Sequence, residues 1–204
     1  MICFGDTDIT LKLAACDLLP QTLTVLGVTR KEVFVYKEEA LRVYQHDPDV
    51  LAQYSEETRK RAIEFVRSVR GVYSEIDPEE QAYMLAAEID TGEQAIFGAT
   101  REAVEFRVLT ADRNALRKLA PAPGCGGICT RMEGRILSLD QILLLLIDRF
   151  GHATLQPMVA PHISCDKAFE AAFAPDVNAM EAEAKLRTRV ALLRAQTAGL
   201  LVPD

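Results

Sequence analysis

The feature that constrains this chain most is an alternation of short apolar segments with longer segments of helical periodicity. We predict strands at 2–4 (ICF), 22–28 (TLTVLGV), 106–110 (FRVLT) and 134–140 (GRILSLD), separated by amphipathic stretches. Strands that alternate with helices form parallel sheets covered by helices on both faces. We therefore predict an α/β protein, a three-layer α/β/α sandwich around a parallel sheet of about four to five strands.

Residue types that begin helices lie between these segments. Thr29 and Glu32 are in the capping-box relation, which predicts the start of a helix over about 30–45. Ser138 is expected to cap the leucine-rich helix behind the last strand. The segment PGCGGICTR around Cys125 is predicted to be a glycine-rich loop, because its C-x3-C spacing is poor for a zinc site.

The chain has 204 residues, which suits one domain with an extension. We assign 1–150 to the α/β domain and 151–204 to a helical C-terminal extension. The extension is expected to be irregular at first and to end in a helix over roughly 177–198. The apolar side of that helix could pack on the domain, bind a partner or contact a second copy of the chain.

Composition narrows the classes of protein that fit. No apolar run is long enough for a membrane span, and no basic region precedes the first apolar stretch, so we expect a cytoplasmic protein without a membrane anchor. The five cysteines are odd in number and irregularly spaced, which is unlike a secreted disulfide scaffold. The net charge of −7 excludes a general nucleic-acid-coating protein, but it does not exclude a nuclease whose acids hold metal ions.

An acidic nuclease needs a local basic patch for phosphates. The helix predicted over 55–70 carries basic side chains on the side opposite its apolar residues. That side is either a solvated helix face or a phosphate-binding surface. Its basic residues are Arg59, Lys60, Arg61, Arg67 and Arg70.

Two carboxylates, Asp6 and Asp8, follow the first predicted strand in the segment DTDIT. This segment is similar to the nucleophile motif of haloacid-dehalogenase-like phosphatases. That resemblance implies Asp6 as the nucleophile and Asp8 as the acid/base. The same class needs a lysine, for which Lys118 is the candidate, and a pair of acids after the last strand, where this chain offers only Asp140.

A second resemblance covers more of the chain. The segments ICFGDTDITLKLA, TGEQAIFGATRE, FRVLTADRNALRKLA and GRILSLDQILLLLI resemble, in their order and spacing, those of a PIN domain. This resemblance implies a catalytic quartet of Asp6, Glu32, Glu93 and Asp112, with Thr110 as the supporting hydroxyl of the last motif. It also implies RNA as the substrate and, because many small members are toxins, an antitoxin-like protein as a partner.

The positions of these acids support the same assignment. Asp6 and Asp112 follow predicted strands, Glu32 lies just beyond the predicted second strand, and Glu93 stands in the first turn of a helix. Ligands bind at the carboxyl ends of strands in open α/β sheets, so the four acids are expected to gather there. Hard oxygen ligands select Mg²⁺ or Mn²⁺. Asp6, Glu93 and Asp112 are the expected metal ligands.

Each acid also has a purely structural interpretation. Glu32 could serve only its capping box, with Glu38 or Glu39 as its substitute at the site, and Asp112 could serve only as an N-cap. Asp8 stands where the PIN family usually has Asn or Ser, and is either an added ligand or a solvent-facing residue. Asp90 is either a second carboxylate near Glu93 or an N-cap.

We therefore expect a Mg²⁺- or Mn²⁺-dependent ribonuclease that hydrolyses phosphodiester bonds of RNA. Two alternatives stay open. One is a phosphatase that uses Asp6 as its nucleophile. The other is a catalytically degenerate PIN-like protein that acts through interactions alone.

Overall fold

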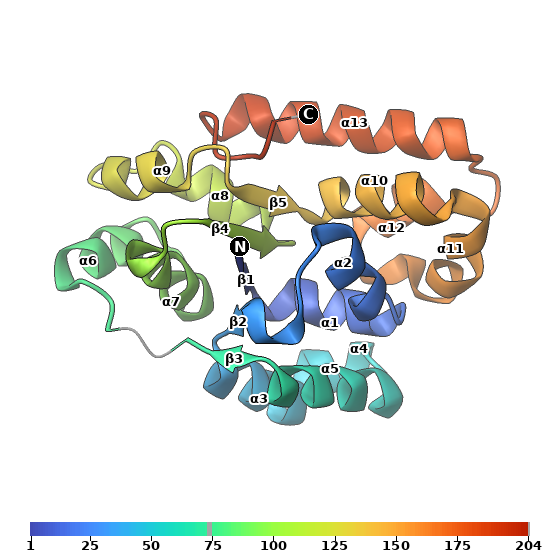
Figure 1. Cartoon of the computed structure of the whole chain (residues 1–204), viewed down its shortest axis with the longest axis horizontal. Helices are drawn as coiled ribbons and strands as arrows, with labels where there is room; N and C mark the ends of the chain where they lie inside the picture. Colours follow the sequence, from blue (N-terminus) through green and yellow to red (C-terminus); the bar gives the residue numbers. More distant parts are fainter. Residues whose placement is uncertain (73–74, 204) are drawn as a thin grey trace.

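The computed structural model describes residues 1–72 and 75–203. Its centre is a five-stranded parallel sheet in the order β3-β2-β1-β4-β5. Helices lie on both faces of this sheet (Figure 1), so the predicted three-layer α/β/α architecture is confirmed. The strands are β1 (Ile2–Gly5), β2 (Val33–Val35), β3 (Arg70–Gly71), β4 (Phe106–Thr110) and β5 (Ile136–Ser138).

Helices make up most of the rest of the described chain. The α-helices are α1 (Thr7–Ala15), α2 (Leu19–Leu26), α3 (Lys37–His46), α4 (Pro48–Gln53), α5 (Glu56–Ser68), α6 (Pro78–Ala86), α7 (Thr91–Ala99), α8 (Arg113–Leu119), α9 (Gly126–Met132), α10 (Leu139–Phe150), α11 (His152–Val159), α12 (Lys167–Phe173) and α13 (Ala179–Gln196). Three short 3-10 helices, η1 (Arg30–Glu32), η2 (Thr100–Glu102) and η3 (Ala160–Cys165), join or extend them.

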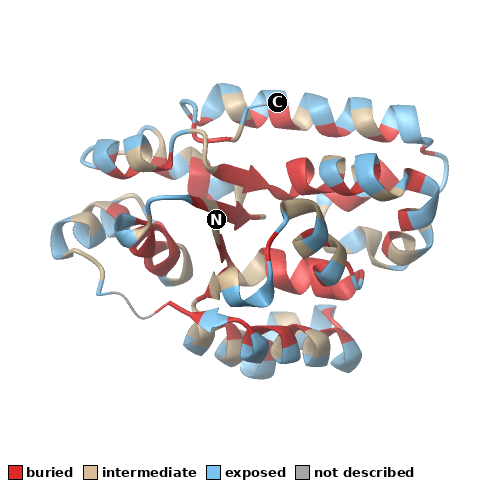
Figure 2. Ribbon diagram, in the orientation of Figure 1, coloured by how far each residue is buried: buried red, intermediate tan, exposed pale blue. Residues whose placement is uncertain are grey.

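The sheet separates two hydrophobic cores, because successive side chains of a strand point to opposite faces. Cys3 of β1 and Leu109 of β4 belong to the core shared with α1, α5 and α10, whereas the adjacent residues Phe4 and Val108 belong to the core shared with α7, α8 and α9. Figure 2 shows the buried strands between helices whose outer sides are exposed. The short apolar runs of the sequence are therefore buried on both faces, as a parallel sheet requires.

The second strand is where the prediction from sequence is wrong. The segment predicted as a strand, 22–28, lies mostly in α2, which ends at Gly27 with φ +65°. A short apolar run does not by its periodicity distinguish a strand from a buried helix. The threonines of the run fit the helix, because the Thr22 hydroxyl donates to the carbonyl of Leu18, four residues earlier.

The true second strand, β2, lies inside the predicted helix 30–45. The predicted capping box between Thr29 and Glu32 is present, but it caps only the single turn of η1. The helix begins later, at Lys37, as α3. A capping box identifies the start of a helical turn without setting how far the helix continues, and here the apolar residues Val33 and Val35 pair with β1 instead.

Two segments predicted as loops are helical. The glycine-rich segment forms α9, in which Ile128 and Met132, four residues apart, are buried on one side. The segment after residue 150 forms α11, η3 and α12 rather than an irregular stretch. Both sets of helices are stabilised by the core they cover, because short helices gain most of their stability from packing.

Residues 151–203 contact the sheet domain through both cores. The predicted final helix is confirmed as α13, which packs against α10 and α12. Its buried residue Leu186 belongs to one core and Val190 and Leu193 to the other. Beyond α13, Leu201 forms a parallel bridge with Ile136 of β5. Of the three roles expected for the apolar side of this helix, the structure shows the first, packing on the domain.

The membrane test gives one further observation. Among residues 1–72 and 75–203, no single helix is long and apolar enough to cross a membrane. Helices α1 and α2 are long and apolar enough only when taken together, and the chain bends by 116° at the break between them.

Candidate functional site

Asp6 is placed at the carboxyl end of β1, as the sequence predicts. Its side chain is buried at 4% exposure and caps α1, where Oδ1 accepts a hydrogen bond of 2.6 Å from the Ile9 amide. Its Oδ2 accepts a hydrogen bond of 3.2 Å from the Ala111 amide, just beyond β4. Asp6 thus joins the ends of the two central strands.

Asp112 and Thr110 continue this edge at the end of β4. The Asp112 Oδ1 atom accepts hydrogen bonds from the amides of Asn114 (2.7 Å) and Ala115 (2.9 Å), so Asp112 is the N-cap of α8. The buried Thr110 hydroxyl accepts from the Asp112 amide at 2.9 Å and hydrogen-bonds to the Asp6 carboxyl. Thr110 therefore links the two acids, and Asp112 keeps its Oδ2 atom for a ligand.

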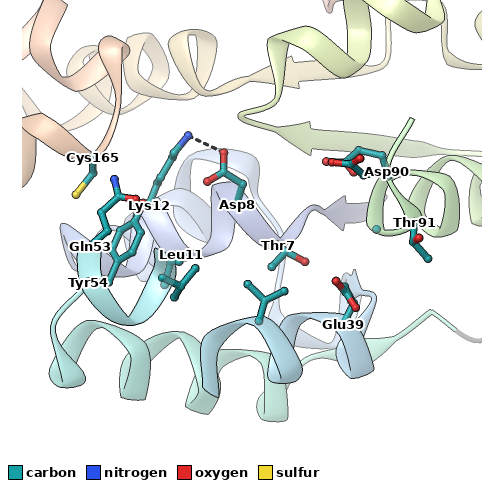
Figure 3. Close-up of a pocket in the computed structure, with 14 residues that line it drawn as sticks. Thr7, Asp8, Leu11, Lys12, Glu39, Gln53, Tyr54, Asp90, Thr91 and Cys165 are labelled. Carbon is teal, nitrogen blue, oxygen red and sulfur yellow. Dashed lines mark hydrogen bonds and ion pairs between the residues drawn. The ribbon is translucent and has the colours of Figure 1, made fainter. Parts of the chain in front are cut away.

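Two further acids, Asp90 and Glu93, lie at the start of α7. Asp90 occupies the N-cap position of α7, but its side chain makes no capping hydrogen bond. It points instead toward Asp8 across a cavity (Figure 3). Glu93 lies in the first turn of α7 and lines the same cavity. Of the two interpretations of Asp90, the structure favours a second carboxylate.

Asp8 is held by a cation of the protein itself. The Lys12 Nζ atom, one turn along α1, lies 2.6 Å from Asp8 Oδ2 and 2.7 Å from Asp166 Oδ2. The other oxygen of Asp166 caps α12 by accepting from the Ala168 amide at 2.7 Å. Lys12 therefore ties the start of α1 to the C-terminal segment. Neither interpretation offered for Asp8 includes an ion pair with Lys12. The second pair, between Lys12 and Asp166, joins residues that are 154 positions apart in the sequence.

The cavity between these elements has a volume of about 530 Å³. Asp8, Glu39, Asp90 and Glu93 line one part of it, together with the backbone at Thr7, Thr91 and Gly92 (Figure 3). The remaining part is bordered by Leu11, Lys12, Val43, Val50, Gln53, Tyr54 and Cys165. Carboxylates from three different helices therefore face a single space.

Burial and mutual repulsion change the ionisation of these acids. Burial, and then the charge of Asp8, raise the pKa of Asp6 to about 7, against the opposing hydrogen bonds from Ile9 and Thr110. Burial, and then the charges of Asp6, Asp112 and Asp90, raise the pKa of Glu93 to about 8. Burial also raises the pKa of Asp8, in spite of the opposing charge of Lys12. A cation placed among these acids would relieve that repulsion.

The donor set suits a hard divalent cation that keeps part of its water shell. Among the described residues, no three His, Cys, Asp or Glu side chains are close enough together to hold a metal ion as a group. Mg²⁺ is commonly held by one or two carboxylates and several waters, so a site of this kind does not need such a group. The carboxylates nearest such an ion would be Glu93, which lines the cavity, and Asp6 and Asp112, which do not line it but whose charges act on Glu93.

Glu32 is the predicted site residue that the structure does not bring to the edge. It precedes β2, and its Oε2 atom accepts hydrogen bonds of 2.8 Å from the amide and the hydroxyl of Thr29. Its Oε1 atom lies 3.8 Å from the amino group of Met1, at the opposite end of β1 from Asp6. The expected position of Glu32 at the carboxyl edge is therefore wrong, because that expectation depended on the misplaced second strand.

Glu39 takes the place expected of Glu32. It lies in α3, which follows the carboxyl end of β2, and it lines the cavity. Arg42 forms an ion pair with Glu39 at 2.5 Å. The sequence signal was present, since Glu39 follows the apolar run VFV, but the run was assigned to a helix.

The basic side of α5 does not contribute to the cavity. The Arg59 Nε atom donates to the carbonyl of Tyr54, and an Arg61 Nη1 atom donates to the carbonyl of Ala14 at 2.8 Å. Arg70, predicted for the same helix, lies in β3 instead, and its guanidinium is 5.3 Å from the centre of the Phe34 ring. These contacts favour a structural and solvated role for this helix side over a phosphate-binding one.

Comparison with known proteins adds no identity. No family model matches the chain, and no curated protein or solved structure matches it either. The chemistry of the carboxyl edge is therefore the basis for assigning a function.

Proposed function

We propose that this protein is a Mg²⁺- or Mn²⁺-dependent endoribonuclease whose site is the carboxyl edge of the sheet. The observation that carries the proposal is the pair of acids Asp6 and Glu93, whose pKa values are raised to about 7 and 8 by burial and by neighbouring carboxylates. Within residues 1–72 and 75–203, neither acid has an ion pair, whereas Asp8 has Lys12. Buried carboxylates arranged in this way are typical of sites that bind a cation.

The residues would divide the work as follows. Because no three acids of the described residues stand close enough to hold an ion together, one or two of Asp6, Glu93 and Asp112 would bind it directly and the rest through its water shell. Thr110 links Asp6 and Asp112. When bound, the ion supplies an activated water and neutralises charge at the phosphorus. Glu39 and Asp90 line the path by which substrate would enter.

RNA as the substrate rests on the resemblance of the motif segments to PIN domains. The toxin-type role and an antitoxin-like partner rest on that resemblance alone. The positions of the acids support its general plan, with Glu39 in place of Glu32. Hydrolysis of a phosphodiester needs a metal-activated water and charge neutralisation but no protein nucleophile. Acids that hold a metal ion are therefore sufficient for this reaction.

The phosphatase alternative has less support from the geometry. Asp6 is 4% exposed and does not line the cavity, so its carboxylate is not placed for direct attack on a substrate phosphate. Lys118 pairs with Glu88 at 3.2 Å on the surface. Asp140, the acid after the last strand, is buried against Arg189. The groups that a phosphatase would need are thus engaged elsewhere.

The test is Asp6→Asn in a Mn²⁺-dependent assay on single-stranded RNA. We expect cleavage to fall by about 100-fold or more, because a neutral amide is a poor ligand for the ion. Asp148→Asn, an exposed acid on α10, is the matched control and should cleave like the unaltered protein. Equal cleavage by Asp6→Asn, or release of phosphate from a small monoester with no RNA cleavage, contradicts the proposal. Absence of heat on titration with Mn²⁺ would instead favour the interaction-only protein.

A further inference from the structure

The cavity has a second end that the proposed chemistry does not use. The acids that line it come from α1, α3 and the start of α7, whereas its other end is walled by Leu11, Val43, Val50 and Tyr54. Figure 3 shows Gln53, Tyr54 and Cys165 grouped around Lys12, on the far side of Asp8 from Asp90 and Thr91. The single cavity is thus acidic at one end and mostly apolar at the other.

We propose that the apolar end binds one nucleobase of an RNA strand, next to the phosphate that is cut at the acidic end. The inference rests on the proposed function, because it places the phosphodiester among the acids. The volume of about 530 Å³ exceeds what a hydrated ion and a phosphate occupy. Specific recognition of single-stranded RNA uses splayed bases that enter pockets with apolar or aromatic walls and a few hydrogen-bonding groups.

The apolar end is a built feature rather than a gap between helices. The Asp47 carboxylate caps α4, accepting from the amides of Asp49 and Val50. The amide of Tyr54 donates to the carbonyl of Val50, and the Tyr54 side chain is buried. Leu11 is buried at 2% exposure in the floor contributed by α1. These contacts fix the wall before any ligand arrives.

Two groups at this end are available for the polar edge of a base. Gln53 is exposed, and its side-chain amide makes no hydrogen bond to the described residues. An amide both donates and accepts, so it can pair with the edge of a base. The Lys12 ammonium has three donors, two of which are used by Asp8 and Asp166. Lys12 lines the cavity, so its third donor is left for a ligand bound there.

The C-terminal segment closes this end. Cys165, the last residue of η3, lines the cavity, and the next residue, Asp166, is held by Lys12. An apolar peptide side chain is the competing occupant of such a pocket. The Gln53 amide favours a base over an aliphatic side chain, because the polar edge of a base can pair with an amide and an aliphatic group cannot.

The experiment measures binding of the four ribonucleosides to the full chain without divalent metal, by chemical-shift titration. Nucleosides carry no charge, so the acids do not repel them. Val50→Trp fills the apolar end, and Gln53→Leu removes the amide while leaving the wall. Val104→Trp and Gln81→Leu are matched controls, because both residues are exposed and neither lines the cavity. We expect saturable binding of at least one nucleoside, weakened about tenfold by each cavity variant and unchanged in the controls.

Three results would overturn the nucleobase proposal: no nucleoside saturates, both cavity variants bind like the unaltered chain, or N-acetyl-leucinamide binds more tightly than every nucleoside. Mn²⁺-dependent RNA cleavage separates this failure from that of the proposed function. Cleavage with an unchanged cut-site pattern in Val50→Trp removes the base subsite and leaves the nuclease. Nucleoside binding without any RNA cleavage keeps the subsite and removes the nuclease.

Discussion

Glu32 and Glu39 stand at opposite ends of β2, a strand of three residues, and their surroundings differ completely. Glu32, at the amino edge of the sheet, is half-buried, and hydrogen bonds from the amide and the hydroxyl of Thr29 lower its pKa. Glu39, beyond the carboxyl edge, lines the cavity that Asp8, Asp90 and Glu93 also line. In a parallel sheet all strands point the same way, so the residue after a strand meets those after its neighbours, and the residue before it does not.

The same contrast holds for the charges of the two edges. At the carboxyl edge, acids raise one another's pKa because they are buried together, as Asp6 and Glu93 show. At the amino edge, the acid is satisfied by local donors and by the amino group of Met1. An acid with its own local donors has no need of a cation, whereas a buried group of acids does.

The largest expected difference between the edges is in catalysis. Glu93→Gln should reduce Mn²⁺-dependent RNA cleavage by about 100-fold, because it removes a carboxylate ligand from the site. Glu32→Gln should leave cleavage within about twofold, since Glu32 is distant from the other acids. The measurement is kcat/KM on one RNA oligonucleotide. Equal losses in the two variants would remove the functional distinction between the edges.

A second difference concerns stability at the carboxyl edge. Lys12→Ala should lower the free energy of unfolding by about 2–4 kcal/mol, because Asp8 and Asp166 lose their shared and largely buried cation. Lys167→Ala removes a lysine that pairs with Glu170 on the surface, where both side chains are exposed, and should cost less than about 0.5 kcal/mol. Urea unfolding measures both. A loss in Lys12→Ala no larger than in Lys167→Ala would show that the bridge does not stabilise the fold.

The smallest expected effect is a pH-dependent one. Because the pKa of Glu93 is raised from 4.5 to about 8, the folded protein binds its proton more tightly than the unfolded chain. Its contribution to stability is therefore complete below about pH 4 and is lost as the pH rises toward 8. Relative to Glu93→Gln, the unaltered protein should lose about 1–3 kcal/mol across that window in metal-free buffer.

Thermal unfolding of both proteins from pH 4 to 9 checks this expectation. Addition of Mn²⁺ at pH 8 should remove the difference if the ion binds beside Glu93, because the ion stabilises the ionised form. A stability difference that does not change with pH would mean that Glu93 titrates near its ordinary pKa.

Local patterns in the sequence were sufficient where a structure depends on near neighbours. The N-cap at Ser138 is present as predicted, because it is a contact across three residues. The strand at 106–110 was identified from its own apolar residues. Asp6 and Asp112 were placed at the carboxyl edge because each directly follows a strand whose position was right.

The errors arose where two local patterns were equally acceptable. The segment 22–28 and the segment 33–35 are both short and apolar, and only pairing with β1 selects the second as a strand. This single choice moved the expected acid from Glu39 to Glu32. A single misplaced strand is enough to predict a neighbouring residue at the wrong edge of the sheet.

By itself, the sequence determined the α/β class, the parallel sheet with its helical layers, and the position of Asp6, Glu93 and Asp112 near strand ends and a helix start. Only the tertiary structure decided which glutamate joins them, that Lys12 bridges Asp8 to Asp166, and that α4 and η3 close one end of the cavity. The physical reason is distance along the chain. Periodicity and caps act over a few residues, whereas strand pairing, long-range ion pairs and cavity walls depend on segments that meet only when the chain is folded.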